Sequence, residues 1–283
     1  MLSSLPHDSP GDALRRPPRS LKQEYQEFLL DRIEEYKNTV SREELLRIGD
    51  EAVRELEANA QDQYLLTEVL LLEHVDRLIA RRLRLPSFQR WRQKHRALRE
   101  AQRQPTHWGL DAEHPVVPWA PRLGPGDLAL VIGASVLPAA LLISAHDVGV
   151  LLLDQELAAV EGAESRAVTE QLAARFESLV VHFGSWLPDV LPSLVVIDPA
   201  ALASARAKDR RAFLADLQAR TRPGGVHIIL PGPKGEAVIP LALKGLQAEY
   251  DGWQVQRHRR GKGGGFTALK PARQADTRAN VSD

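Results

Sequence analysis

The sequence of 283 residues contains no cysteine. This absence excludes disulfides, iron–sulfur clusters, zinc sites built on thiolates and a cysteine nucleophile. The sequence also has no run of about 18 apolar residues, and its first residues lack the apolar stretch of a secretory signal. We therefore expect a cytoplasmic protein without membrane insertion.

Neither charge predominates, because 37 lysines and arginines balance 37 acidic residues. Any preference for a polyanion must therefore come from local clustering of charge. The sequence also shows few residues spaced as the ligands of a metal ion usually are. His107 and His114 have no third ligand near them in the sequence, so we expect no metal site.

The segment Leu128–Gln155 has the pattern of a strand, a tight turn, a helix and a second strand. Gly133 follows the first apolar run, where a residue without a Cβ lets the chain turn close to a ligand. Pro138 suits the first turn of the helix. Asp154 closes the second strand about 20 residues after the glycine, the spacing at which a carboxylate can bond to ribose hydroxyls.

The pattern of strands and helices continues to about residue 270. After Asp154 we expect helices at 156–176, 203–220 and 237–250, and strands at 178–183, 193–197, around 226–230, 253–258 and 266–270. The last two strands are too closely connected for a helical crossover, so they must form an antiparallel hairpin. The predicted fold is therefore an α/β, mostly parallel Rossmann-like sheet with a terminal antiparallel hairpin.

With these elements the chain resembles the class I S-adenosylmethionine-dependent methyltransferases over about residues 123–271. The matching segments are LGPGDLALVIG, VGVLLLDQ, LVVIDP, LQARTRPGGVHIILP and GGFTALKP. The resemblance implies S-adenosylmethionine as cofactor and a cofactor site at eight positions. Those positions are Gly133, Ala134, Ser135, Asp154, Gln155, Ser185, Trp186 and Asp198.

Several residues depart from the family's pattern. Val131 stands where the first strand usually carries an acid, and Ser185 replaces the acid that would contact the adenine amine. Ser135 and Leu137 replace glycines of the loop. Two alternatives therefore stay open, an active methyltransferase of unknown substrate and a methyltransferase-like fold that works as a binding or scaffold module. No catalytic base is identified by its spacing.

The N-terminal part predicts an all-helical domain. We expect helices at 21–38, from a capping box Ser41-x-x-Glu44 to about residue 60, at 63–83, and after Pro86. The third helix is strongly apolar and is the expected centre of this domain. Its apolar residues are Leu65, Leu66, Val69, Leu70, Leu72, Val75, Leu78 and Ile79.

Basic residues are concentrated between Arg77 and Arg103, where Glu100 is the one acid after Asp76. Arginine forks fit phosphate oxygens, so nucleic acid or another polyanion is a candidate partner. A solvated charged face, or pairing with the acidic helices before it, is the alternative. A protein partner or a second copy of the chain is a further candidate.

These patterns divide the chain into five parts. We expect a disordered N-terminus at 1–20, the helical domain at 21–103, a Pro/Trp-rich linker at 104–122, the methyltransferase-like domain at 123–271 and a disordered tail at 272–283.

Overall fold

The computed structural model describes residues 20–59, 68–184, 186–230, 243–258 and 265–272. The expected disordered ends, the start of the third helix, Ser185, the start of the helix expected at 237–250 and most of the hairpin loop lie outside the described residues. The chain forms two compact units, Arg19–Leu98 and Arg99–Asp283. None of the described helices is both long and apolar enough to span a bilayer.

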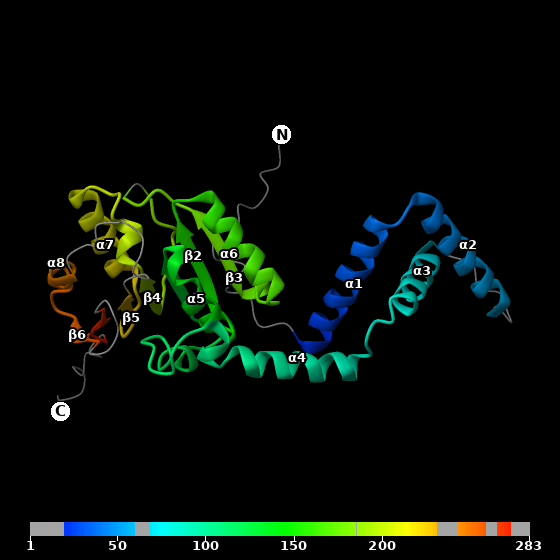
Figure 1. Cartoon of the computed structure of the whole chain (residues 1–283), viewed down its shortest axis with the longest axis horizontal. Helices are drawn as coiled ribbons and strands as arrows, with labels where there is room; N and C mark the ends of the chain where they lie inside the picture. The colour runs from blue at the N-terminus through cyan, green and yellow to red at the C-terminus, as the bar shows by residue number, and fades with distance from the viewer. Residues whose placement is uncertain (1–19, 60–67, 185, 231–242, 259–264, 273–283) are drawn as a thin grey trace, which may run out of the picture. The chain divides into compact units, whose positions relative to one another are not determined.

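The described part of the first unit contains the helices α1 to α4 (Figure 1). These are α1 (Leu21–Thr39), α2 (Arg42–Asn59), α3 (Glu68–Arg82) and α4 (Phe88–Gln102), whose last residues belong to the second unit. The expected cap of α2 is confirmed, since the Ser41 hydroxyl accepts a hydrogen bond of 3.2 Å from the Glu44 amide. The Glu44 carboxylate binds Arg82 of α3 at 2.7 Å, so it stabilises the packing of α3 on α2.

The core of the helical unit contains only one face of α3. Leu78 and Ile79 are buried there with Ile33, Ile48 and Ala52 of α1 and α2. Not all of the apolar residues of the third helix lie in this core. Val69, Leu70 and Leu72 are 65%, 41% and 55% exposed, because a helix with 3.6 residues per turn presents only one side to α1 and α2. Leu65 and Leu66 lie outside the described residues.

The second unit is built on a sheet of seven strands in the order β3-β2-β1-β4-β5-β7-β6. The strands are β1 (Leu128–Ile132), β2 (Gly149–Asp154), β3 (Phe176–Val180), β4 (Leu194–Ile197), β5 (Val226–Ile229), β6 (Gln254–Arg257) and β7 (Phe266–Leu269). Strands β1 to β5 pair in parallel, while β7 is antiparallel to both β5 and β6. The predicted fold class, a mostly parallel sheet with a terminal antiparallel hairpin, is confirmed.

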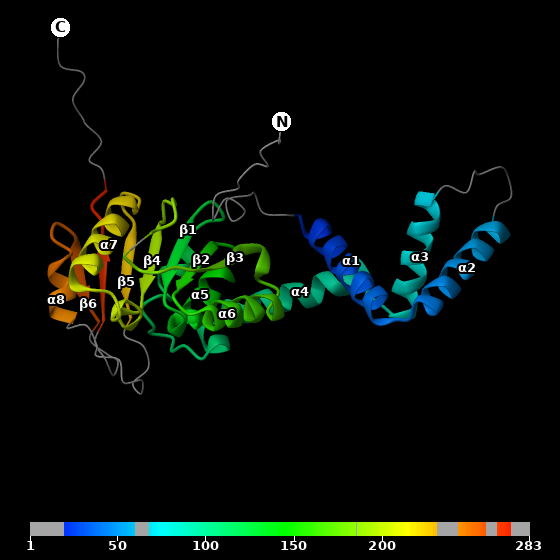
Figure 2. The ribbon, with the colours of Figure 1, turned by 90° about the horizontal axis from the view of Figure 1, so that it is seen from above.

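Helices cover both faces of this sheet (Figures 1 and 2). Helices α5 (Leu137–Ser144) and α6 (Leu157–Thr169) pack on the face to which Ala129 and Val131 point. Helices α7 (Ala207–Arg220) and α8 (Leu243–Ala248) pack on the opposite face, with Leu130 and Ile132. Because both faces are buried, β1 is a continuous apolar run without alternation.

Helix α6 is shorter than predicted, and β3 begins earlier. The helix ends at Thr169, where Gln171 adopts a left-handed backbone with φ of +58°. The amides of Gln171 and Leu172 bond back to the carbonyls of Val168 and Ala167, which is the Schellman arrangement for a helix end. Glycine usually takes this left-handed position, so glutamine gave no signal of the helix end.

The Pro/Trp-rich segment 104–122 packs into the α/β unit. It contains two short 3-10 helices, η2 (Pro105–Trp108) and η3 (Ala120–Arg122). Trp108, Val116 and Ala120 are at most 9% exposed and join the core on the α5 side of the sheet. The Trp108 indole donates to the Gln102 carbonyl at 2.6 Å. The segment is therefore a covering layer of the sheet and not a free spacer.

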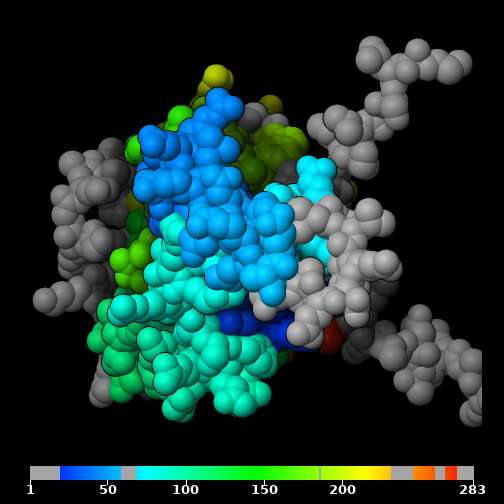
Figure 3. Space-filling model, turned by 90° about the vertical axis from the view of Figure 1, so that its right-hand side faces the viewer, coloured from blue at the N-terminus to red at the C-terminus, as the bar shows by residue number. Residues whose placement is uncertain are grey.

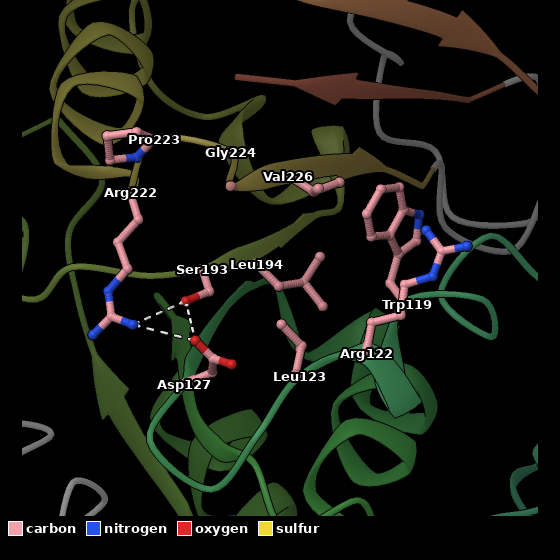
Figure 4. Close-up of a pocket in the computed structure, with 11 residues that line it drawn as sticks. Trp119, Arg122, Leu123, Asp127, Ser193, Leu194, Arg222, Pro223, Gly224 and Val226 are labelled. Atoms are coloured by element: carbon pink, nitrogen blue, oxygen red, sulfur yellow. Dashed lines mark hydrogen bonds and ion pairs between the residues drawn. The ribbon is translucent and has the colours of Figure 1, made fainter. Parts of the chain in front are cut away.

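A cavity of about 320 Å³ lies at the amino ends of β1, β4 and β5 (Figure 4). Asp127 is one of the residues that line it. One carboxylate oxygen accepts from the Ser193 hydroxyl at 2.6 Å and from Arg222 at 3.2 Å, and the other accepts from the Gly124 amide at 2.8 Å. These bonds join the starts of three neighbouring strands, so the polar groups around Asp127 stabilise the sheet.

The buried side chain of His227, in β5, connects this strand to residues that follow α7 and α8. The Thr221 hydroxyl donates to the Leu217 carbonyl at 2.7 Å, so it accepts from Nε2 of His227 at 2.7 Å. Nδ1 of His227 then accepts from the Tyr250 hydroxyl at 2.9 Å. Burial lowers the pKa of His227 to about 3 and raises the pKa of the Tyr250 hydroxyl above its usual range. Both groups are therefore neutral in the folded chain.

Substitution at Asp127 and Arg222 tests the polar cluster at the amino ends. In a double-mutant cycle of Asp127→Asn and Arg222→Gln we expect a coupling of about 1 kcal/mol in the free energy of unfolding, because both residues share Ser193. Urea unfolding followed by tryptophan fluorescence measures it. The control is the cycle of Asp216 and Arg220, a pair one helical turn apart in α7 at 2.8 Å, for which we expect about 0.3 to 0.5 kcal/mol. Equal couplings would show that the cluster adds nothing to an ordinary surface pair.

Acid should weaken the α/β unit through His227. Its folded pKa of about 3 lies below the unfolded value of about 6.5, so below pH 6.5 the unfolded chain takes up a proton that the folded chain does not. This group alone should lower the free energy of unfolding by about 2 kcal/mol between pH 7.5 and 5. Urea unfolding of the wild type and of His227→Gln at several pH values measures the contribution as a difference in slope. Parallel pH dependences would contradict it, because the carboxylates titrate in both proteins.

Candidate functional site

The candidate site lies where β1, β2 and β4 end. These strands are neighbours in the order β2-β1-β4, and the chain proceeds from β1 toward β3 on one side and from β4 toward β6 on the other. Ligands of open α/β sheets bind at such a reversal of strand order, beyond the carboxyl ends of the strands. The cavity around Asp127 lies at the opposite edge, and two of its charged groups, Asp127 and Arg222, bind each other.

Gly133 makes the turn that leaves β1. Its φ of +98° is a conformation that residues with side chains rarely adopt. A Cβ on Gly133 would lie 3.0 Å from the Cβ of Ala201 and 3.1 Å from the Cβ of Asp198. The turn therefore needs glycine both for its backbone and for the close approach of η6 (Pro199–Leu202), the short 3-10 helix after β4.

Asp154 binds the loop that follows Gly133. One carboxylate oxygen accepts from the Ala134 amide at 2.7 Å, and the other accepts from the Glu156 amide at 3.0 Å. Asp154 is only partly buried. An ionised carboxylate has about four acceptor positions, so these two bonds leave room for two further donors.

Asp198 is 3% exposed and holds two loops together. One of its oxygens accepts from the Ala200 amide at 2.9 Å and so caps η6. The other accepts a short hydrogen bond from the Ser135 hydroxyl, which lies in the loop after β1. This carboxylate therefore stabilises the structure. Its bond to Ser135 joins the loops after β1 and β4, between which the strand order reverses.

Gln155 adds a third connection at this edge. Its side-chain amide donates to the Ala201 carbonyl and to the Ser204 hydroxyl, each at 2.9 Å. The roles of Ala201 and Ser204 were not predicted, because neither the packing of a small residue on Gly133 nor a hydrogen bond to Gln155 leaves a recognisable pattern in a sequence.

The structure brings six of the eight predicted positions to one edge. These are Gly133, Ala134, Ser135, Asp154, Gln155 and Asp198. Trp186 is 50% exposed and, within the described part of the chain, makes no hydrogen bond to these loops. Ser185 lies outside the described residues.

The residues fit one end of an adenosyl cofactor better than the other. Asp154 offers acceptors suited to two ribose hydroxyls. At the methionine end, Val131 is fully buried where the family carries an acid, so that position supplies no charge for an amino group. The described residues also contain no group of three His, Asp or Glu side chains that could hold a metal ion.

Comparison with known proteins finds similarity in structure. No protein-family model matches the chain, and no curated protein matches it in sequence. The N-methyltransferase NodS from Bradyrhizobium japonicum WM9 is 13% identical with a TM-score of 0.42, over 57% of this chain and 99% of that one. An O-methyltransferase family protein from Burkholderia thailandensis is 13% identical with a TM-score of 0.44, over 68% and 63%. The glycopeptide N-methyltransferase MtfA, complexed with sinefungin, is 15% identical with a TM-score of 0.44, over 57% and 87%.

The fold itself rests on the strand order of this chain. Five parallel strands are followed by a hairpin whose last strand, β7, is inserted antiparallel beside β5. With Gly133 after β1 and Asp154 after β2, this is the arrangement that the sequence resemblance implied. The α/β unit therefore has the Rossmann-like fold with a terminal antiparallel hairpin that the resemblance to the class I S-adenosylmethionine-dependent methyltransferases implied.

Proposed function

We propose that the α/β unit binds S-adenosylmethionine at the carboxyl edge of β1 and β2 and acts as a methyltransferase. The observation that carries the proposal is the partly exposed Asp154 carboxylate, which lies beside the Gly133 turn with acceptor positions still available. A carboxylate that takes two ribose hydroxyls gains charge-assisted hydrogen bonds, each of about 1.5 to 3 kcal/mol.

The residues around Asp154 would orient the cofactor and would not supply its chemistry. When bound, S-adenosylmethionine brings a methyl group on a positively charged sulfur that needs only a positioned nucleophile. The Ala134 amide fixes the Asp154 carboxylate, and the Gly133 turn lets η6 approach the loop after β1 closely. Asp198 already caps η6 and binds Ser135, so it is not assigned as a base.

A second candidate function is a binding or scaffold module without catalysis. Two observations favour it. Val131 is buried in the apolar core at the position of the family's acid, and the Ser135–Asp198 hydrogen bond joins the loops across the site. Such a protein would keep the fold, but its own side chains would bind one another at the carboxyl ends of the strands, where the cofactor would otherwise bind.

Calorimetric titration distinguishes the two functions. We expect S-adenosylhomocysteine and S-adenosylmethionine to bind with micromolar Kd, and Asp154→Ala to weaken binding about ten- to a hundredfold through loss of the ribose bonds. The matched control is Glu161→Gln, which removes one exposed acid from α6 of the same unit and should leave Kd unchanged.

The titration also shows when the proposal fails. Absence of binding at millimolar cofactor by the folded wild type would support the module without catalysis. Binding that Asp154→Ala leaves unchanged would place the cofactor elsewhere. Circular dichroism of each variant checks the fold, since the Ala134 and Glu156 amides lose their acceptor in Asp154→Ala.

A further inference from the structure

The basic residues of α3 and α4 fall into two groups that the sequence does not separate. On α3, Arg81 binds Glu55 at 3.4 Å, and Arg82 binds Glu44 and Glu51. These cations neutralise acids of α2. On α4, by contrast, Arg90, Arg92, Lys94 and Arg96 are exposed, and none of the four has an acidic partner among the described residues. Figure 3 shows these helices at the surface of the helical unit.

Two arginines at the end of α4 already have partners in the α/β unit and are therefore not available to bind a polyanion. Arg99 donates to the Gln171 carbonyl at 2.7 Å, and Arg103, just beyond the helix, binds Asp147 at 2.8 Å. Both bonds lie within the α/β unit. Within the basic segment from Arg77 to Arg103, the candidate surface on α4 therefore consists of the four cations between Arg90 and Arg96.

The inward side of α4 is fixed by aromatic packing. The Trp91 ring lies 5.4 Å from Tyr25 and 6.2 Å from Phe28 of α1, and 4.6 Å from the His95 ring. Nε2 of His95 is 3.1 Å from the Glu24 carboxylate. These contacts determine which side of α4 is turned away from α1.

The side of α4 opposite Trp91 and His95, here called the outward side, carries uncharged residues over most of its length. Basic side chains lie along both of its flanks. With about 100° between successive residues, Gln89, Gln93 and Ala97 lie opposite Trp91 and His95. Arg90 and Lys94 then lie about 60 to 100° to one side, and Arg92 and Arg96 lie at about the same angle on the other. Glu100 is the one acid of the outward side, at the end near the α/β unit.

We propose that α4 binds duplex DNA with its outward side in the major groove. The groove is about 12 Å wide and admits a helix of about 10 to 12 Å diameter. Two rows of cations on opposite flanks match the phosphates of the two strands that border the groove. Gln93 and Ala97 then face the bases, where glutamine can bond to adenine and alanine can contact the thymine methyl group. This inference does not depend on the proposed methyltransferase activity.

Fluorescence anisotropy with a labelled 24-base-pair DNA duplex of mixed sequence tests the proposal with the full chain. We expect log Kd to rise with log salt concentration, each phosphate contact adding about 0.9 to the slope. The variant Arg90→Gln/Arg92→Gln/Lys94→Gln/Arg96→Gln should reduce that slope by about three to four units and weaken binding at least tenfold at about 100 mM salt.

A matched control removes the same charge from other helices. The variant Arg32→Gln/Arg47→Gln/Arg54→Gln/Arg77→Gln removes four exposed arginines of α1, α2 and α3, three of which bind acids. It should keep the slope of the wild type. If both variants lost the same amount of slope and affinity, the effect would come from net charge alone, and the assignment of DNA binding to α4 would be overturned.

Two more measurements test the groove. Gln93→Glu places a carboxylate on the outward side and should weaken DNA binding severalfold, so it serves if the quadruple variant does not fold. Unlabelled duplex RNA should compete at least tenfold less well than duplex DNA, because the narrow major groove of A-form RNA excludes a helix. No binding at about 50 mM salt, an unchanged slope in the quadruple variant, or equal competition by RNA would each overturn the proposal.

Discussion

The α/β unit depends on a strand that is buried on both faces. No residue of β1 is more than 2% exposed, so its side chains must be covered from two directions. Helices α5 and α6 with the segment 104–122 cover one face, and α7 and α8 cover the other. Parallel sheets exist almost only with both faces covered in this way. The reversal of strand order beside β1 follows, since α5 lies on one face and α7 on the other, and the reversal creates the edge at which Gly133 and Asp154 meet.

The strands and most helices of this unit could be predicted from the sequence because their signals are local. Apolar runs such as Leu128–Ile132, with glycine or Asp-Pro after them, predict buried strands directly. The end of α6 could not be predicted, because Gln171 takes a left-handed position through contacts made by Leu172 in the core. The exposed face of α3 was also missed, since apolar residues on two sides of a helix do not indicate which side packs.

The candidate site was predicted in position better than in detail. Spacing along one β-α-β unit brings Asp154 to the Gly133 loop, and sequence shows that spacing. The Ser135–Asp198 bond and the packing of Ala201 on Gly133 join residues more than 60 positions apart. Nothing in a single sequence reports such pairs. The same limit applies to charge, because the arginines of α3 and α4 look alike until the acids of α2 are placed beside one of the two groups.

The packing of the segment 104–122 determines how the chain can be divided. Sequence motifs alone would start the α/β part near residue 123, just before β1. A fragment cut there would lack Trp108, Val116 and Ala120, which cover one face of the sheet, and Gln102, which is fully buried and donates to the Glu170 carbonyl at 2.8 Å. The exposed apolar surface would favour aggregation of the fragment. A fragment that begins at Arg99 keeps this layer, so a division of the chain within the last turn of α4 leaves the covered sheet intact.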